Sequence, residues 1–251
     1  MRQEIIDKLN EIEKKEHIKI IYAAESGSRA WGFESEDSDY DVRFIYKREK
    51  EDYLCLEEKS DVIVLPIDPV FDISGWDIKK ALKLLYKSNP SLLEWFASPI
   101  VYRETKEASY IRSLIPLYFS QKKSFYHYQR MAGMHFKHIK KEKIAVKKYL
   151  YVIRSLLACQ YIIDYRKQPP IEMERLIECE LPIELKKDMD KLLMIKKKSS
   201  EKQYVDHILN LDCYIEIGLE KSDINFTNDE EVSWDKLNEA FRKIIESNVS
   251  H

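Results

Sequence analysis

The stretch ESGSRAWGFESEDSDYDVR, from Glu25 to Arg43, decides the fold. A Gly-Ser turn near its start is followed by two aspartates, Asp39 and Asp41, with one residue between them. Because successive side chains of a strand point to opposite faces, both aspartates share one face if this segment is a strand. Two carboxylates on one pleat repel each other unless a cation lies between them, and oxygen-ligated Mg²⁺ is the usual cation beside phosphates. The stretch therefore predicts a cation site on a strand and chemistry on a nucleoside triphosphate.

The residues on the amino-terminal side predict a helix followed by a buried strand. Ile5, Leu9 and Ile12 recur at helical spacing, so we expect an amphipathic helix over residues 2–15. The run His17–Ala24 is β-branched and aromatic and leads directly toward the Gly-Ser turn. These features are typical of a buried strand that ends in a tight turn.

The residues on the carboxyl side predict more strands and then a helix. From Asp39 to Tyr46 the apolar residues alternate with the two aspartates and an arginine, so one face packs into the core and the other forms the site. Two short runs, Asp61–Pro66 and Pro69–Ser74, also have the composition of strands. Gly75 is expected to open a helix that Asn89-Pro90 ends.

Beyond about residue 109 the pattern is almost wholly helical. Apolar residues recur at spacings of three and four in six segments: Tyr110–Ile139, Ala145–Tyr165, Pro170–Glu178, Ile183–Ile195, Gln203–Leu219 and Ser233–Glu246. The sequence therefore predicts an α+β protein in two parts. A part with both strands and helices occupies residues 1–105, and an all-helical part occupies residues 106–251.

Composition limits the classes of protein to consider. Of 251 residues, 44% are hydrophobic, which suffices for a core, and the net charge of −2 gives no overall positive field for a polyanion. The charged first residues do not resemble a signal peptide, and no long apolar run predicts a membrane span. The four cysteines lack metal-site spacing, so we expect reduced, mostly packed thiols in a cytoplasmic protein without membrane contact.

The motif GSRAWGFESEDSDYDVR resembles the signature of the polymerase-beta-like nucleotidyltransferase superfamily. Through DISGWDIKKALKLLYKSNPSLLEWFASPIVY (Asp72–Tyr102), the chain also resembles a predicted nucleotidyltransferase family related to an RNA-repair-pathway polymerase-beta-like group. The resemblance implies a mixed sheet flanked by helices, with three carboxylates that bind two Mg²⁺ or Mn²⁺ ions. It also implies a nucleotidyltransferase domain over residues 1–105 and a helical domain that closes the nucleotide cleft.

The resemblance assigns the metal ligands residue by residue. Asp39 and Asp41 match the paired ligands of the superfamily motif. We choose Asp72 as the third ligand because it interrupts an apolar run, where a charge needs a reason. Asp68, in an expected turn, and Asp77, in the expected first turn of a helix, are the alternatives.

The resemblance also assigns the groups that contact the nucleotide. Gly27 and Ser28 match the turn that holds the triphosphate, where glycine allows close approach of the backbone and serine donates to phosphate oxygens. Arg29 and Arg43 are expected to help electrostatically, and Arg43 can neutralise either phosphate or the aspartates. A P-loop is not expected, because Gly-Lys-Ser/Thr is missing and no helix-start pattern follows Gly27.

A further candidate face lies in the helical part. Lys147, Tyr151 and Arg154 recur at i, i+4 and i+7, so they share one helix face. If that face looks toward the aspartates, it supplies another wall of the nucleotide site. A basic run precedes it, which is either a solvated connector or an electrostatic guide for triphosphate or polynucleotide; it comprises Lys137, Lys140, Lys141, Lys143, Lys147 and Lys148.

The reaction that the resemblance implies is transfer of a nucleoside monophosphate from a nucleoside triphosphate, such as ATP, to a hydroxyl acceptor. The resemblance points to an RNA end as the acceptor. Two alternatives stay open. One is nucleotidylation of a protein, as in minimal enzymes of toxin–antitoxin type, and the other is a nucleotide or RNA sensor without turnover.

Overall fold

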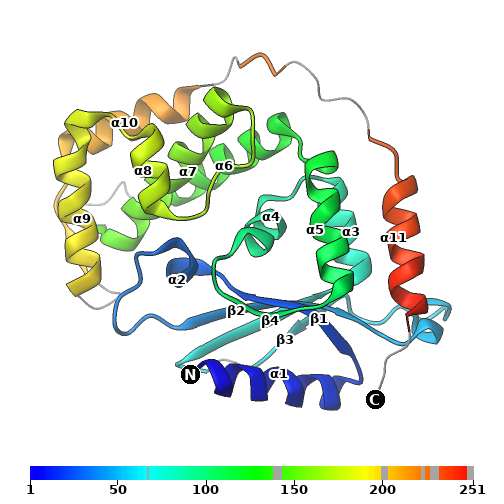
Figure 1. The fold of residues 1–251 in the computed structure, drawn as a ribbon. Helices are drawn as coiled ribbons and strands as arrows, with labels where there is room; N and C mark the ends of the chain where they lie inside the picture. Colours follow the sequence, from blue (N-terminus) through cyan, green and yellow to red (C-terminus); the bar gives the residue numbers. More distant parts are fainter. Residues whose placement is uncertain (67, 138–142, 199–202, 222–223, 227–231, 248–251) are drawn as a thin grey trace. The chain divides into compact units, whose positions relative to one another are not determined.

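The computed structural model describes residues 1–66, 68–137, 143–198, 203–221, 224–226 and 232–247 (Figure 1). Contacts between residues group the chain into two compact units. The sheet unit contains Met1–Gly27, Asp39–Tyr118 and Glu231–His251, and the helical unit contains Ser28–Ser38 and Phe119–Glu230. The domain boundary expected near residue 105 stays a prediction; in this grouping the sheet unit continues to Tyr118 and takes back the carboxyl-terminal segment.

Five strands form the sheet in the order β3-β4-β2-β1-β5, and their bounds are β1 Lys19–Glu25, β2 Tyr40–Lys47, β3 Val62–Val64, β4 Phe71–Asp77 and β5 Val101–Glu104. The central pair β2 and β4 is parallel, whereas β1 with β2, β1 with β5 and β3 with β4 are antiparallel. The predicted α+β class with a small mixed sheet is thus confirmed. The strand β5 had no counterpart in the sequence expectations.

The alternation expected in β2 is present from Asp41 to Phe44, whereas the last residues of the strand, Ile45 to Lys47, are all buried. Val42 and Phe44 are completely buried, while Asp41 and Arg43 on the other face keep partial exposure. Helix α1 (Arg2–Glu16) covers one face of the sheet, and its residues Ile5 and Leu9 share a core cluster with this strand (Figure 1). The predicted helix over residues 2–15 is therefore confirmed, and its burial orients the Asp-bearing face of β2 away from α1.

The rest of the sheet unit is helical: α3 Ile78–Tyr86, α4 Pro90–Ala97, α5 Lys106–Tyr118 and α11 Asp235–Glu246, with a short 3₁₀ turn at Lys50–Tyr53. The helix starts are capped as their sequences require. Asp77 Oδ1 accepts a hydrogen bond from the Lys79 amide at 2.7 Å, and Asn89 Oδ1 accepts one from the Leu92 amide at 3.2 Å with Pro90 at the first helical turn.

The helical unit contains α6 Gln121–Phe136, α7 Val146–Tyr165, α8 Met173–Glu180, α9 Lys186–Lys198 and α10 Leu209–Glu220, together with a 3₁₀ turn at Ile183–Leu185. The short helix α2, Gly27–Trp31, crosses a unit boundary: Gly27 is grouped with the sheet unit, and the other residues of α2 are grouped with the helical unit. Helix α7 is central, because every residue from Val152 to Cys159 is buried, and eight consecutive residues cover all sides of a helix. The helix expected over Gln203–Leu219 begins only at Leu209, as α10. The residues before it form the strand β7, Tyr204–Val205, which pairs with β6, Ile144–Ala145, so this part of the expectation is wrong.

Gly75 does not open a helix, so that expectation is wrong. Strand β4 continues through Gly75 to Asp77, and α3 begins at Ile78. Gly75 lies opposite Phe44 on β2, and a Cβ atom at Gly75 would lie only 2.2 Å from a carbon of the Phe44 ring. The glycine is therefore required by close packing within the sheet, and not by a turn.

Three other expectations need correction. The single helix expected from Tyr110 to beyond residue 136 is two helices, because Ser120 caps α6 by accepting a hydrogen bond from the Lys123 amide at 3.1 Å. Gly27 does begin a short helix, although no helix-start pattern was recognised there. The thiols are not mostly packed, since only Cys159 is buried and the other three cysteines are exposed.

Candidate active site

The first residues of the parallel strands β2 and β4 bring two acidic side chains together. In the register of this pair, Asp41 lies opposite Asp72. Arg43 Nη2 donates to Asp41 Oδ1 at 2.9 Å and to Asp72 Oδ2 at 2.7 Å, and its Nη1 donates to the Asp72 carbonyl at 2.8 Å. Two carboxylate oxygens from adjacent strands therefore converge on one cationic group.

The cluster of Asp41, Asp72 and Arg43 is open to solvent, and the positive guanidinium lies between the two negative carboxylates. The Asp72 side chain is 50% exposed and the Asp41 side chain 21%, so an incoming ligand can reach both. The hydrogen bond from Arg43 holds the pKa of the Asp72 carboxyl below its ordinary value, which keeps this carboxylate charged. Carboxylate oxygens are the donors that Mg²⁺ and Mn²⁺ prefer, so the pair fits a hard divalent cation in place of the guanidinium.

The remaining expected ligand, Asp39, which pairs with Asp41 in the sequence motif, directly precedes β2. Within the described part of the chain, no group of three or more His, Cys, Asp or Glu side chains is close enough to hold a metal ion. Asp39 thus does not complete a group of three with Asp41 and Asp72 in this conformation. Its role as a ligand stays a prediction.

The two alternatives to Asp72 have structural tasks. Asp68 Oδ1 accepts hydrogen bonds from the amides of Val70 and Phe71, at 2.8 and 3.0 Å, as a turn-forming carboxylate does. Asp77 caps α3 and also accepts a hydrogen bond from the Tyr53 hydroxyl at 2.9 Å. Both side chains are occupied in the way that their sequence positions indicated.

Gly27 makes room for the Asp41 carboxylate, and the approach of its backbone to a triphosphate, which the resemblance implies, stays a prediction. Its φ of 62° lies in the left-handed region, which side chains other than glycine rarely adopt. A Cβ atom at this position would lie 2.0 Å from Asp41 Oδ2. The neighbouring amide of Ser26 donates to the Asp41 carbonyl at 2.8 Å, so the chain leaving β1 runs against the start of β2. Only a glycine leaves room here for the Asp41 carboxylate.

Glu25 is a site residue that the sequence interpretation missed. It is completely buried at the end of β1, and its Oε1 accepts a hydrogen bond from the Asp41 amide at 2.8 Å. Its Oε2 accepts another from the Tyr102 hydroxyl. The buried Glu25 carboxylate binds the Asp41 amide and so fixes the position of the Asp41 backbone from which the side chain extends. The available signal was a charge directly after the apolar run Ile20–Ala24.

In the helical unit, Ser28 and Arg29 belong to a buried polar network. The Ser28 hydroxyl donates to Ser38 Oγ at 3.4 Å, and the Arg29 guanidinium donates to the Ser38 carbonyl at 2.5 Å. Ser28 is only 2% exposed. Contact of these two residues with a triphosphate stays a prediction.

The expected face on α7 gathers around an aromatic residue of α2. The Arg154 guanidinium lies 4.1 Å from the centre of the Trp31 ring, and the Tyr151 ring meets the same ring edge-on at 5.2 Å. The Lys147 ammonium lies 5.8 Å from the Tyr151 ring centre. Arg154 is 2% exposed and donates to the Ile171 carbonyl at 3.0 Å. The three residues share a face as predicted, and their part in nucleotide binding stays a prediction. Lys140 and Lys141 of the basic run lie outside the described residues.

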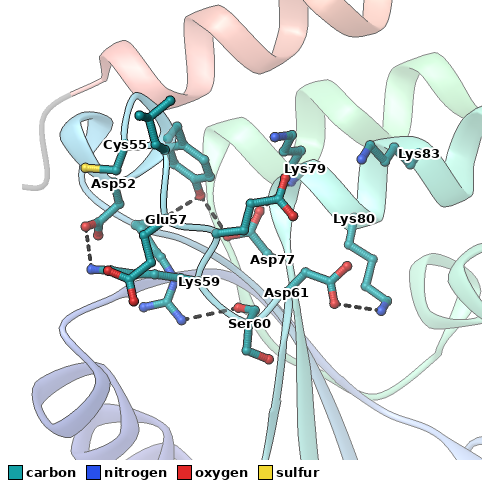
Figure 2. A pocket seen from close by; sticks show the side chains of 14 residues that line it. Asp52, Cys55, Glu57, Lys59, Ser60, Asp61, Asp77, Lys79, Lys80 and Lys83 are labelled. Atoms are coloured by element: carbon teal, nitrogen blue, oxygen red, sulfur yellow. Dashed lines mark hydrogen bonds and ion pairs between the residues drawn. The ribbon is translucent and has the colours of Figure 1, made fainter.

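A separate cavity of about 490 Å³ lies at the opposite ends of the same strands (Figure 2). Arg48 follows β2 and Asp77 ends β4, whereas the aspartates of the candidate site stand near the starts of these strands. Ion pairs join Lys59 to Asp52 and Lys80 to Asp61 at 2.9 Å in this cavity. Its basic and acidic lining residues are equal in number, so its charge favours no anionic ligand.

The described helices include none that combines the length and apolarity required to cross a bilayer.

Comparison with known proteins adds two findings. The family model described as the RNA repair pathway DNA polymerase beta family matches residues 1–243. The chain is also 45% identical, over 224 residues, to a Bacillus subtilis (strain 168) protein named "Uncharacterized protein YcgL". That alignment covers 88% of this chain and 86% of the relative. Both Asp-bearing strands fall within the matched family region.

Proposed function

The chain belongs to the RNA repair pathway DNA polymerase beta family, and from this membership we propose that it is a metal-dependent nucleotidyltransferase. It would transfer a nucleoside monophosphate from a nucleoside triphosphate to a hydroxyl acceptor. The observation that carries the proposal is the convergence of Asp41 Oδ1 and Asp72 Oδ2 on one guanidinium nitrogen. Oxygens so placed from adjacent strands suit a cation bridged to phosphates.

The metal requirement follows from the donor set. Asp39, Asp41 and Asp72 would hold Mg²⁺ or Mn²⁺, which, when bound, neutralise the triphosphate and lower the pKa of an attacking hydroxyl. Gly27 leaves space for the Asp41 carboxylate, and Glu25 fixes the Asp41 backbone. The chain's own contribution is thus to place the carboxylates before substrate arrives.

Arg43 has two tasks in this proposal. Without substrate it neutralises Asp41 and Asp72 and so prevents their mutual repulsion. When a triphosphate binds, its planar guanidinium can donate to phosphate oxygens, for which arginine is well suited. The exchange of partners releases the carboxylates at the moment when they are needed.

The reaction itself is a displacement at phosphorus. The acceptor hydroxyl oxygen forms a bond to the α-phosphorus, the bond between that phosphorus and the oxygen leading to the β-phosphate breaks, and pyrophosphate leaves. The hydroxyl proton passes to solvent or to the Asp72 carboxylate, which is more exposed than the Asp41 carboxylate. Positioning and charge stabilisation supply most of the catalysis in such transfers.

We propose an RNA end as the acceptor, and the family description supports this choice. With a net charge of −2, the chain has no general attraction for RNA, so a local surface must recognise it. The cytoplasm is the proposed location, because all four cysteines are unpaired thiols, as is usual in a reducing compartment.

The test incubates each of the four triphosphates, labelled at the α-phosphate, with Mn²⁺ and with tRNA, nicked RNA or protein, and measures both release of pyrophosphate and label on the acceptor. We expect label on RNA from the wild type and at least about a hundredfold less from Asp41→Ala. Asp61→Asn is the control, because Asp61 is an exposed carboxylate at the far end of the sheet.

Other outcomes separate the alternatives. Labelled protein in place of labelled RNA would favour a protein-nucleotidylating enzyme. Nucleotide binding without pyrophosphate release, unaffected by Asp41→Ala, would favour a sensor.

A further inference from the structure

Lys196, in the last turn of α9, is a buried lysine without a role in the site described above. It is 1% exposed, although an ammonium group is costly to remove from water. Its Nζ donates to Ser35 Oγ at 2.7 Å, a contact between residues 161 positions apart. Both residues belong to the helical unit. A buried charge directed at a serine of the segment between Gly27 and Asp39 needs a reason.

Ser35 belongs to a buried serine network that leads to Ser28. Its amide donates to Ser38 Oγ at 3.0 Å, and the two hydroxyl oxygens are also 3.0 Å apart. The Ser28 hydroxyl donates to the same Ser38 oxygen. All three serines are at most 5% exposed. The ammonium group of Lys196 therefore stands at one end of a hydrogen-bonded series, and Ser28 stands at the other.

The same segment is also fixed by apolar contacts. Phe33 is completely buried in the core cluster of the helical unit, and Trp31 packs against that cluster. The apolar anchors hold the middle of residues 28–38, while the serine network holds its ends. The hydrogen bond from Lys196 to Ser35 is thus a polar link between α9 and this loop.

We propose that Lys196 is a positioning residue for the nucleotide-binding loop, residues 28–38. Its hydrogen bond to Ser35 holds Ser35 and Ser38 in place, and these two set the position of the Ser28 hydroxyl. The role in nucleotide binding rests on the proposed function above, in which Ser28 contacts the triphosphate. Loss of the ammonium group would loosen the loop that carries Ser28 and leave the aspartate pair of the sheet unit intact.

The first experiment needs no nucleotide. Hydrogen–deuterium exchange of the peptides covering residues 28–38 is compared in the wild type, Lys196→Met and Lys197→Met. Methionine is similar in length but cannot donate, and Lys197 is an exposed neighbour on the same helix. We expect exchange in this loop to accelerate about tenfold or more in Lys196→Met, because hydrogen bonds to charged groups are worth that much, and to stay unchanged in Lys197→Met.

The second experiment measures steady-state pyrophosphate release. For Lys196→Met we expect KM for the triphosphate to rise about tenfold, while kcat changes less than about threefold. Ser35→Ala removes the acceptor and should reproduce both effects, so it serves as the second variant if Lys196→Met does not fold. Lys196→Arg, which keeps a donor and the charge, should recover part of the KM.

The two experiments fail in different ways. Unchanged loop exchange in Lys196→Met and Ser35→Ala would overturn the positioning role, whatever the turnover. Accelerated exchange with an unchanged KM would also overturn it, because the contact would then be purely structural. A wild type without any nucleotide turnover would instead refute the proposed function.

Discussion

Arg43 shows, at the scale of single residues, how the chain tolerates two carboxylates without a metal ion. Its guanidinium contacts Asp41 and Asp72 at the point where their oxygens converge. A divalent cation that binds the same oxygens must therefore compete with it. Whether the cation displaces the guanidinium from these oxygens therefore depends on whether Arg43 has a phosphate to bind instead.

Removing Arg43 should consequently strengthen the response to metal alone. We predict that Arg43→Met is less stable than the wild type without metal, because the two aspartates lose the guanidinium that neutralises their charge, and gains more in melting temperature from Mn²⁺. Thermal denaturation with and without Mn²⁺ measures both effects. An equal Mn²⁺ response in the two proteins would show that the guanidinium and the ion do not share a position.

Glu180, at the end of α8, makes the helical unit sensitive to pH. Burial, together with a hydrogen bond to Asp164, raises the pKa of its carboxyl to about 7, against about 4.3 for an unfolded glutamate. Between these values the folded chain keeps a proton that the unfolded chain has lost. The protonated Glu180 carboxyl therefore contributes fully to the stability of the folded state below about pH 4.3. This contribution disappears as the pH rises through about 7 and the folded chain loses the proton.

We predict that Glu180→Gln flattens this pH dependence. The variant should resemble the wild type near pH 4.5 and be more stable than it at pH 8, because glutamine has no charge to bury. Thermal denaturation at the two pH values measures the difference, with Glu178→Gln, an exposed neighbour, as the control. If Glu180→Gln followed the wild type at both pH values, the raised pKa would be refuted.

Secondary-structure elements differ in how far local sequence determines them. The alternation of β2 and the helical spacing of α1 and α7 are visible in the sequence because burial repeats with the period of the element. Asp72 was also recognisable, as a charge within an apolar run. The expectation for Gly75 was wrong, because glycine often marks the end of a strand or the start of a helix, but here it is required by the close contact with the Phe44 ring. Contacts between distant elements, such as Glu25 with Asp41 or Lys196 with Ser35, leave no periodic signal.

The close packing of β4 on β2 gives an element-scale prediction. Gly75→Ala should destabilise the protein by about 1–3 kcal/mol, because its Cβ must displace the Phe44 ring or the strand. Gly133→Ala is the matched control: it lies within α6 and no atom outside its local helix lies within 4 Å of its Cβ position. It should stabilise by about 0.5–1 kcal/mol. Urea denaturation measures both, and equal effects would contradict the packing interpretation.

At the scale of the whole molecule, the last helix of the chain belongs to the same unit as its first strands. Helix α11 belongs to the sheet unit, and Trp234 stacks on Tyr86 with ring centres 3.7 Å apart. The buried Lys47 of β2 donates to the carbonyls of Ile244 and Ser247, at 3.0 and 2.7 Å, at the carboxyl end of the helix. A cation at this end is favoured by the helix dipole as well. The helical periodicity of the sequence predicts α11, but it does not predict that Lys47 binds the carboxyl end of this helix.

Loss of this long-range connection should be measurable as global stability. We predict that Lys47→Met lowers the free energy of unfolding by about 1.5–3 kcal/mol, the range for hydrogen bonds from a charged donor. Lys50→Met is the control, because its pair with Glu246 is exposed, 3.8 Å long and worth less than about 1 kcal/mol. Equal losses in the two variants would mean that α11 is not secured through Lys47.

Binding of Mn²⁺, followed by electron paramagnetic resonance in the presence of a non-hydrolysable triphosphate, tests the proposed metal site most directly. We expect two bound ions per chain in the wild type and in Asp61→Asn, and loss of at least one ion in Asp41→Asn and in Asp72→Asn. Binding that is absent from the wild type, or that survives unchanged in both aspartate variants, would contradict a metal-dependent nucleotidyltransferase at this pair of strands.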